Sequence, residues 1–339
     1  MSIQYMEIKI SQRLSYLVDK FDIGNFIRYE KIENGLINDS YKVETEKGIF
    51  VFQRLSSLWN EKVIGDYCEV QRYLRTNGVF VPVLLHSSTG NSFLKESDGL
   101  WRTFEYIQHD EVITPSPEIA YEAGAMLGKF HSLMAKSSFK PSFTLAGYHN
   151  TPKILDDLVK TAVRLEYGDK LLLVGKEVDL LSKKLPQYYL PRNHEKIVIH
   201  GDPKLLNFLF KNNSATALLD LDTMMEASPL IDIGDALRSW CRRKPATSEF
   251  MPEIFEEAVK GYSSTAPFQY CISGIKNAMG LITLELAARY LTDYFNESYF
   301  GFNKEKYATL AEQNITRCRR YIDYYNNFMA HKIPYHHDE

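Results

Sequence analysis

The chain has 339 residues, of which 45% are hydrophobic and 24% are charged, and its formal net charge is -3. These values predict a globular protein large enough for two compact parts, and so mild a charge gives no reason to expect a nucleic-acid or membrane-surface partner. Four cysteines lie far apart without a CxxC pair, so neither a disulfide framework nor a zinc site is expected. The amino-terminal stretch lacks a signal-peptide core and no apolar run approaches the roughly 20 residues of a membrane helix, so we expect a cytoplasmic protein.

The first part of the chain is predicted to be mainly antiparallel sheet. After an amphipathic helix over residues 5–20, the stretch "YEKIENGLINDSYKVETEKGIFVFQRL" alternates apolar and polar residues around two glycines, which is typical of strands joined by turns. A helix over 61–77 ends at an Asn-Gly pair. The stretches "FVPVLLHSS", "SFLKES" and "LWRTFEYIQ" are predicted to form further strands.

The remainder is predicted to be mainly helical, with apolar periodicity over 117–137, 152–184, 250–264, 268–297 and 303–330. The sequence therefore favours an α+β protein with a β-rich part, residues 1–108, followed by a larger helical part, residues 109–339. The basic run Arg242-Arg243-Lys244 is expected to be a solvated helix end.

Polar residues gather in "VIHGDPKLLNFLF", residues 198–210, and in the apolar run "ATALLDLD" that follows. The intervening "KNNS" predicts a turn, so the two runs are expected to form a hairpin whose strand starting at Asn207 lies beside the strand ending at Asp220. Asp202 precedes the same open end. Carboxylate and amide oxygens suit magnesium together with substrate phosphates, and Lys204 can place a charge near a phosphate. These are the parts of a phosphoryl-transfer site.

The stretch "HGDPKLLNFLF…ALLDLD" resembles the catalytic and metal loops of the aminoglycoside phosphotransferase-like kinases. The resemblance implies a protein-kinase-like, two-lobed fold that uses ATP and Mg²⁺. It implies Asp202 as the catalytic base, with Lys204 steadying charge on the phosphoryl group, and Asn207 and Asp220 as metal ligands. Asp222 is a further candidate metal ligand, or caps the next loop. His200 is expected to brace the loop, and His131 to be a satisfied core histidine.

The resemblance also implies where nucleotide would bind. "IENGLINDSYKVET" matches the hairpin that covers the phosphates, and "WRTFEYIQ" matches the strand that runs to the adenine hinge. The strand that usually offers an ATP-binding lysine reads "FVFQRL", and alternation allows only one of its two polar residues to face the nucleotide, without indicating which. The candidate nucleotide contacts are Gly35, Asn38, Gln53, Arg54, Glu105 and Ile107, with Glu69 as partner of the basic group.

Three later segments, "LAGYHNTPKIL", "LLDLDTMMEASPLIDIGDALR" and "LELAARYLTDYFNESYF", look closest to the N-acetylhexosamine 1-kinases. This implies transfer of phosphate to the anomeric hydroxyl of a free amino sugar. The candidate sugar-binding residues, besides Asp202, are Asp235, Arg289, Tyr299 and His149. Arg289 could instead form a surface ion pair with Asp293, and Asp232 is expected to cap a helix.

Two alternatives stay open from the sequence. One is a related kinase that acts on another sugar, an amino alcohol such as choline or homoserine, or an aminoglycoside. The other is a binding module of the same fold without catalysis, although Asp202, Asn207 and Asp220 are all retained. The sequence gives no oligomeric state.

Overall fold

The computed structural model describes residues 3–32, 37–191, 193–243 and 247–332. The chain forms two compact units: unit 1 holds residues 1–110, 141–143 and 216–222, and unit 2 holds the rest. The boundary near residue 108 predicted from sequence lies close to the end of the first segment of unit 1. The two short later segments are an addition that the sequence did not indicate.

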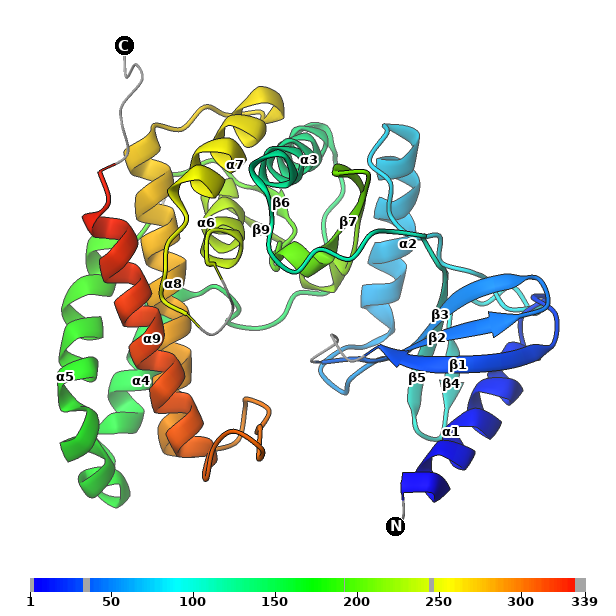
Figure 1. Ribbon diagram of the computed structural model, residues 1–339, viewed down its shortest axis with the longest axis horizontal. Coiled ribbons are helices and arrows are strands. Elements are labelled where there is room, and N and C mark those ends of the chain that lie inside the picture. Colours follow the sequence, from blue (N-terminus) through cyan, green and yellow to red (C-terminus); the bar gives the residue numbers. More distant parts are fainter. Residues whose placement is uncertain (1–2, 33–36, 192, 244–246, 333–339) are drawn as a thin grey trace. The chain divides into compact units, whose positions relative to one another are not determined.

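Unit 1 is built on a five-stranded antiparallel sheet in the order β1-β2-β3-β5-β4 (Figure 1). The strands are β1 (Phe26–Ile32), β2 (Asp39–Thr45), β3 (Gly48–Arg54), β4 (Leu94–Glu96) and β5 (Gly99–Glu105). Helix α1 (Ile3–Val18) contributes Leu14, Leu17 and Val18 to a core shared with Val43 and Phe52 of the sheet. Tyr41 and Val43 alternate with polar residues along β2, whereas β3 carries the continuous apolar run Ile49–Phe52, of which only Phe52 is fully buried.

The helix α2 (Glu61–Thr76) begins where the side chain of Asn60 accepts a hydrogen bond from the backbone of Lys62. The predicted strand "FVPVLLHSS" is wrong, because only an isolated bridge joins Leu84 to Phe104 of β5. Pro82 is the third residue of that segment and has no N–H to donate to a ladder, which accounts for the irregular backbone.

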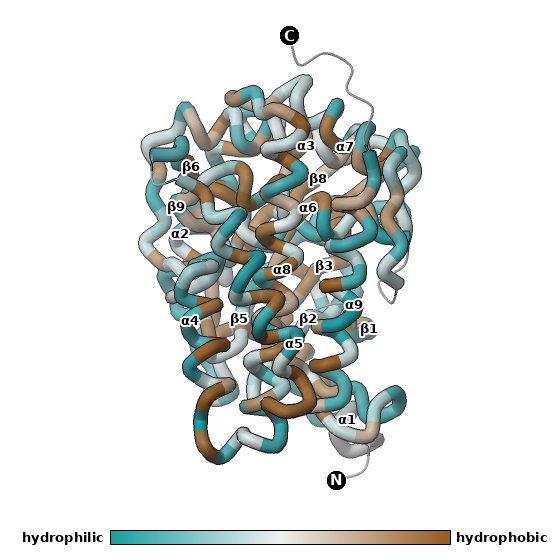
Figure 2. Tube along the Cα trace, turned by 90° about the vertical axis from the view of Figure 1, so that its left-hand side faces the viewer, coloured by the Kyte–Doolittle hydropathy of each residue, from teal (hydrophilic) through white to brown (hydrophobic). Residues whose placement is uncertain are grey.

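Unit 2 is mainly helical. Its helices are α3 (Pro117–Lys136), α4 (Thr151–Ala162), α5 (Gly168–Lys184), α6 (Pro229–Trp240), α7 (Pro252–Thr265), α8 (Ile272–Asn296) and α9 (Leu310–Ala330). The helix predicted over 152–184 is interrupted between α4 and α5, where a short 3₁₀ turn (Leu165–Tyr167) precedes Gly168. Brown and teal segments alternate along α4 and α5 in Figure 2, as expected of helices with one buried face.

Helices α3 and α7 lie side by side (Figure 1) and approach closely through glycines. A Cβ at Gly261 would lie 2.0 Å from the carbonyl oxygen of Tyr121, and one at Gly124 would lie 2.1 Å from that of Ala258. Only glycine leaves room for backbones at this separation. The pair therefore forms a rigid support beside β6 (Ile197–Ile199), which pairs antiparallel with β9 (Met225–Ala227).

The predicted hairpin is present as β7 (Phe208–Lys211) and β8 (Ser214–Leu218), which form a two-stranded sheet. Its turn places Asn212 at φ 50° and Asn213 at φ 63°, the left-handed backbone that a tight hairpin turn requires. Asn207 lies one residue before the strand, in the 3₁₀ turn Leu205–Asn207, rather than starting it. Asp220 follows β8 by two residues and has φ 59°.

None of the helices in the described residues is both long and apolar enough to cross a membrane.

Candidate active site

The loop that carries Asp202 follows β6 and is held by a buried carboxylate. Asp232, in α6, accepts hydrogen bonds from the backbone N–H of His200 (2.7 Å) and of Gly201 (2.8 Å). Its Oδ2 also lies 2.9 Å from Nε2 of His131, whose Nδ1 is 2.9 Å from the hydroxyl of Tyr262. His131 is therefore the satisfied core histidine that the sequence predicts. Asp232 is not the predicted helix cap, since Ser228 caps α6.

The same loop depends on a backbone conformation that only glycine adopts easily. Gly201 has φ +86°, and a Cβ there would lie 2.3 Å from the carbonyl oxygen of Thr223. The hydroxyl of Thr223 donates to the carbonyl of His200 at 2.9 Å, and Nδ1 of His200 lies 3.3 Å from the N–H of Asp202. His200 is fully buried, which agrees with the bracing role expected of it.

His149 contacts both this loop and helix α8. Its Nδ1 lies 2.9 Å from Oε1 of Glu285, and its Nε2 lies 2.9 Å from the carbonyl oxygen of Gly201. Burial alone would lower the pKa of His149, but the charge of Glu285 and the hydrogen bond to it outweigh burial and raise the pKa to about 9. The imidazolium then donates from both nitrogens. Because both ring nitrogens are engaged and its side chain is 4% exposed, His149 positions the loop, contrary to the predicted contact with substrate.

Asp202 lies at the partly exposed end of the loop. Its Oδ2 is 2.6 Å from Nζ of Lys204, and its side chain is 23% exposed. The side-chain amide of Asn207 donates to the carbonyl oxygen of Asp202 at 2.8 Å. The amide nitrogen of Asn207 is thus engaged by the loop, and the amide oxygen is the group that Asn207 can offer to a ligand.

Two of the predicted substrate residues, Arg289 and Tyr299, lie together in unit 2 beside Tyr148, on which the charge of Asp202 acts. The guanidinium of Arg289 lies over the ring of Tyr148 (5.5 Å) and donates from Nη2 to the hydroxyl of Tyr299 (2.7 Å). Burial, followed by the charges of Asp202 and Asp235, raises the pKa of Tyr148 well above its usual value. Tyr148 was missed from the sequence, although it is adjacent to the predicted His149.

Asp235 is engaged by a residue that the sequence analysis also missed. Arg238, one turn further along α6, donates from Nε to Oδ1 of Asp235 at 2.8 Å. Burial would lower the pKa of Arg238, but the charges of Asp235 and Asp202 help to raise it. The i, i+3 spacing in "DALR" was the available signal. The alternative ion pair of Arg289 is not formed: Asp293 is buried and accepts backbone N–H groups of Ser298, Tyr299 and Phe300.

Asp222 is a buried acid of unit 1. Its two oxygens accept from Nη1 (2.7 Å) and Nη2 (2.6 Å) of Arg102 on β5, and Oδ2 also accepts from the side chain of Asn38 at 3.2 Å. Burial raises the pKa of Asp222 above its ordinary value, and the charge of Arg102 opposes this rise only in part. With both oxygens engaged and none of its side chain exposed, Asp222 serves Arg102 rather than a metal.

The two polar residues of β3 have different partners. Gln53 accepts from Nε and Nη2 of Arg102 (2.8 and 2.6 Å) and donates to the hydroxyl of Ser40 (2.9 Å). Arg54 instead forms an ion pair with Asp39 on β2. The buried cation of this sheet is therefore Arg102, which the sequence did not reveal. Which of the two β3 residues contacts nucleotide stays a prediction.

The other predicted nucleotide residues are spread over unit 1. Glu69 is exposed and does not partner the β3 residues; the inward acid of α2 is Asp66, which accepts the backbone N–H groups of Ser142 and Phe143 at 3.0 Å. Asn38 also accepts from the backbone of Ser56, Glu105 is exposed at the end of β5, and the carbonyl of Ile107 lies 2.8 Å from Nδ1 of His109. Gly35 lies outside the described residues.

The metal ligands predicted from the sequence are the amide of Asn207 and the carboxylates of Asp220 and Asp222. They do not form a complete shell of protein ligands by themselves. The described residues contain no group of three or more His, Cys, Asp or Glu side chains that could hold a metal ion. Asn207 and Asp220 would supply two oxygens, which suits magnesium only when phosphate oxygens and water complete its shell.

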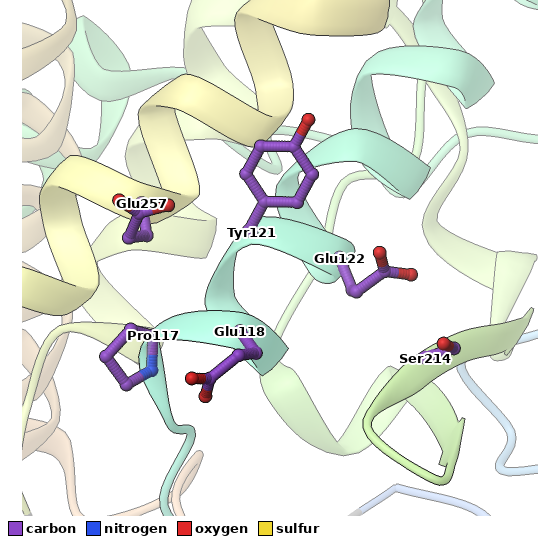
Figure 3. Close-up of a pocket in the computed structure, with 6 residues that line it drawn as sticks. All are labelled: Pro117, Glu118, Tyr121, Glu122, Ser214 and Glu257. Carbon is purple, nitrogen blue, oxygen red and sulfur yellow. The ribbon is translucent and has the colours of Figure 1, made fainter.

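A pocket of about 480 Å³ lies elsewhere on unit 2. It is lined by Pro117, Glu118, Tyr121, Glu122, Ser214 and Glu257 (Figure 3). Figure 3 shows the three carboxylates on α3 and α7, with Glu122 directed towards Ser214. None of the predicted site residues lines it, so it is separate from the catalytic loop.

The comparisons with known proteins agree with this arrangement. Residues 28–268 match the model of the phosphotransferase enzyme family. A homoserine kinase of Bartonella tribocorum is 21% identical over 236 residues, which are 67% of this chain and 69% of that protein. A homoserine kinase of Neisseria meningitidis is 22% identical over 252 residues, 73% and 77% of the two chains.

Solved structures show the same fold. Amicoumacin kinase in complex with AMP-PNP, Ca²⁺ and Ami superposes with a TM-score of 0.67 at 17% identity, covering 94% of this chain and 95% of that one. A microcompartment-associated aminopropanol kinase gives 0.66 at 17% identity, covering 94% and 97%. The antiparallel sheet, the helical unit and the family match lead to one conclusion: the chain belongs to the phosphotransferase enzyme family and is a small-molecule kinase.

Proposed function

We propose that this kinase transfers the γ-phosphoryl group of ATP to a hydroxyl of a small polar acceptor bound in unit 2, with Asp202 as the catalytic base. One observation carries the proposal: Asp202 is partly exposed on a loop whose backbone is fixed by Asp232, Thr223 and His149. A base held in a fixed orientation supplies what phosphoryl transfer most needs, which is positioning.

Asp202 accepts the hydroxyl proton as the acceptor oxygen approaches phosphorus. Nζ of Lys204 forms an ion pair with Asp202 at 2.6 Å. The same ammonium group can turn to the phosphoryl oxygens when nucleotide is present. Tyr148, Asp235 and Arg289 supply a ring, a carboxylate and a guanidinium on the acceptor side. Such a mixture suits an acceptor with several polar groups.

Magnesium stays part of the proposal, with Asn207 and Asp220 as its ligands. The amide oxygen of Asn207, whose amide nitrogen is held by the carbonyl of Asp202, fits a metal or metal-bound water. Asp220, within unit 1, holds the left-handed backbone at φ 59° that turns the chain at the end of the hairpin. When bound, the ion would neutralise charge on the transferred phosphoryl group.

An amino alcohol of the homoserine type is the acceptor that the relatives favour, because eight of them carry the name homoserine kinase. Homoserine offers a hydroxyl, an ammonium and a carboxylate. Carboxylates and guanidinium groups of the kind found beside Asp202 are the groups that would recognise them.

An N-acetylhexosamine is the second candidate, favoured by a different observation. The segments that resemble the N-acetylhexosamine 1-kinases contribute Tyr148, Arg289 and Tyr299, and these three side chains lie together in unit 2. Aromatic faces and an arginine suit a sugar ring with hydroxyl groups.

A panel of acceptors decides between them. Purified protein is incubated with ATP, magnesium and one of homoserine, aminopropanol, choline, N-acetylglucosamine, N-acetylgalactosamine or kanamycin, and the products are identified by phosphorus NMR. Phosphohomoserine or another amino-alcohol phosphate supports the first candidate, whereas an anomeric sugar phosphate supports the second. Nucleotide binding without turnover of any acceptor would contradict the assignment of Asp202 as a base for these substrates.

A further inference from the structure

Unit 2 contains a cluster of arginines that the catalytic roles above do not use. We call it the arginine cluster: Arg238 in the last turn of α6, Arg242 two residues beyond that helix, and Arg317 and Arg320 on α9. They surround two tyrosines. Nη1 of Arg238 is 3.4 Å from the hydroxyl of Tyr321, Arg242 lies over the ring of Tyr321 (4.8 Å), and Arg317 lies over that of Tyr290 (5.5 Å).

The cluster has more buried N–H groups than protein partners. Nε and Nη1 of Arg242 and Nε of Arg320 are buried and, within the described part of the chain, donate to no acceptor. Buried donors are almost always satisfied in native proteins, so unsatisfied ones require an explanation. The guanidinium of Arg242 lies 4.8 Å from the ring centroid of Tyr321 and 5.8 Å from that of Tyr324, and it also hydrogen-bonds to Tyr321, so Nε and Nη1 are the donors left unused.

The positive charge of the cluster is only partly balanced. Asp235 pairs with Arg238, and Glu249 pairs with the neighbouring exposed Arg243, but among the described residues no carboxylate lies within ion-pair distance of Arg242 or Arg320. The effect reaches Tyr321: burial would raise the pKa of its phenol, yet the charges of Arg242 and Arg238 lower it. The surroundings of Tyr321 therefore stabilise negative charge.

The cluster is connected to the acceptor side of unit 2. Arg238 donates from Nε to Asp235 and from Nη1 to the hydroxyl of Tyr321. The charge of Asp202 acts on the same guanidinium. An acceptor whose hydroxyl meets Asp202 would thus have this positive region within reach of its far end.

We propose that Arg242, supported by Arg320 and Tyr321, forms a subsite for an oxyanion, a carboxylate or phosphate group, that belongs to the acceptor. The planar edge of a guanidinium matches the two oxygens of such a group and would satisfy the unused donors. The link to the acceptor rests on the proposed function, whereas the oxyanion site itself does not. A neutral sugar has no group for this subsite, but a carboxylate-bearing amino alcohol or a sugar acid has.

Binding of simple anions tests the subsite without any turnover. The full chain is saturated with AMP-PNP and magnesium to occupy the nucleotide site, and inorganic phosphate and acetate are titrated by calorimetry at constant ionic strength. Arg242→Gln is expected to weaken the binding of either anion about 10- to 100-fold, as for loss of a charged hydrogen bond. Arg242→Lys keeps the charge without the planar edge, so its anion affinity should lie between those of the wild type and Arg242→Gln.

Arg243→Gln is the matched control, because Arg243 is adjacent, 49% exposed and paired with Glu249. It should bind the anions as the wild type does. Equal anion affinity in the wild type and Arg242→Gln, or no anion binding to either, would overturn the proposal even if the chain proves to be an active kinase.

Kinetics then identify the source of the anion. With the acceptor found in the panel, Arg242→Gln should raise KM for the acceptor at least about tenfold and leave KM for ATP unchanged. The same acceptor with its anionic group converted to an amide should show no difference between the variants. Anion binding that depends on Arg242, with an unchanged acceptor KM, would assign the subsite to free phosphate and overturn the link to the acceptor.

Discussion

Arg102 and Asp222 form a two-pronged ion pair inside unit 1, with N···O distances of 2.7 and 2.6 Å and at most 2% of either side chain exposed. Gln53 accepts two further hydrogen bonds from the guanidinium, and Asn38 donates to the carboxylate. The pair thereby connects β5 to the segment that carries Asp220. Since Asp220 is two residues away on a left-handed backbone, the pair fixes the chain next to the proposed metal ligand.

Breaking this pair should be costly for stability. Asp222→Asn keeps the shape but leaves the Arg102 charge buried without its counter-charge, so we expect the free energy of unfolding to fall by about 3–5 kcal/mol. Urea denaturation followed by circular dichroism measures the change. The double variant Arg102→Met with Asp222→Asn should recover part of the loss, because no buried charge is then left alone.

An exposed pair of the same sheet is the control. Glu44 pairs with Arg28 across β1 and β2 with 36% and 78% of the side chains exposed, so Glu44→Gln should cost at most about 1 kcal/mol. If Asp222→Asn were no more destabilising than this control, the buried pair would not fix the segment as argued.

The imidazolium of His149 predicts a pH dependence of stability. Its folded pKa, about 9, lies above the usual 6.5, so its contribution is fully present below pH 6.5 and is lost as the pH rises through 9. The difference in unfolding free energy between the wild type and His149→Gln should therefore shrink by on the order of 3 kcal/mol across that window. Denaturation at several pH values measures it. A difference that does not vary with pH would show that His149 is neutral in the fold.

Gly201 provides a sharp test of the catalytic loop. Gly201→Ala would bring a Cβ to 2.3 Å from the Thr223 carbonyl on a backbone with φ +86°, so the loop must distort. We expect a large loss of kcat with nucleotide binding retained. Gly65→Ala in α2, where the added Cβ meets nothing within 4 Å, should be neutral or stabilising by up to about 1 kcal/mol. Similar activity losses in both variants would indicate a general effect on folding instead.

The elements predicted best from the sequence are those with local signals. The Asn-Asn turn identified the β7–β8 hairpin, and apolar periodicity identified most helices of unit 2. The prediction of a strand over "FVPVLLHSS" was wrong because it relied on the apolar residues and gave too little weight to Pro82. The interrupted helix near Gly168 failed because periodicity continues across the break.

The site was only partly predictable for the same reason. Asp202 and Asn207 stand in one motif, but the partners that hold the loop come from distant segments: Asp232 lies about 30 residues on, and His149 about 50 residues back. Arg102 and Asp222 are 120 residues apart, and no local pattern relates them. Asp222 stands two residues after Asp220, so the sequence alone suggests a metal ligand. The sequence does not show that Arg102 engages both oxygens of Asp222.

The role of Asp202 can be separated from that of its loop by one substitution. Asp202→Asn keeps the volume of the side chain and its backbone contacts, but an amide cannot accept the hydroxyl proton, so kcat should fall about 10²- to 10⁴-fold. Asp179→Asn is the control, because that carboxylate is 60% exposed on α5 and only pairs with Lys183. Steady-state turnover and AMP-PNP binding by calorimetry are measured on both. Since the loop is held by the backbone of His200 and Gly201, nucleotide affinity should match the wild type in each variant. Turnover of Asp202→Asn close to that of Asp179→Asn would remove Asp202 as the base and leave its ion pair with Lys204 as its only function.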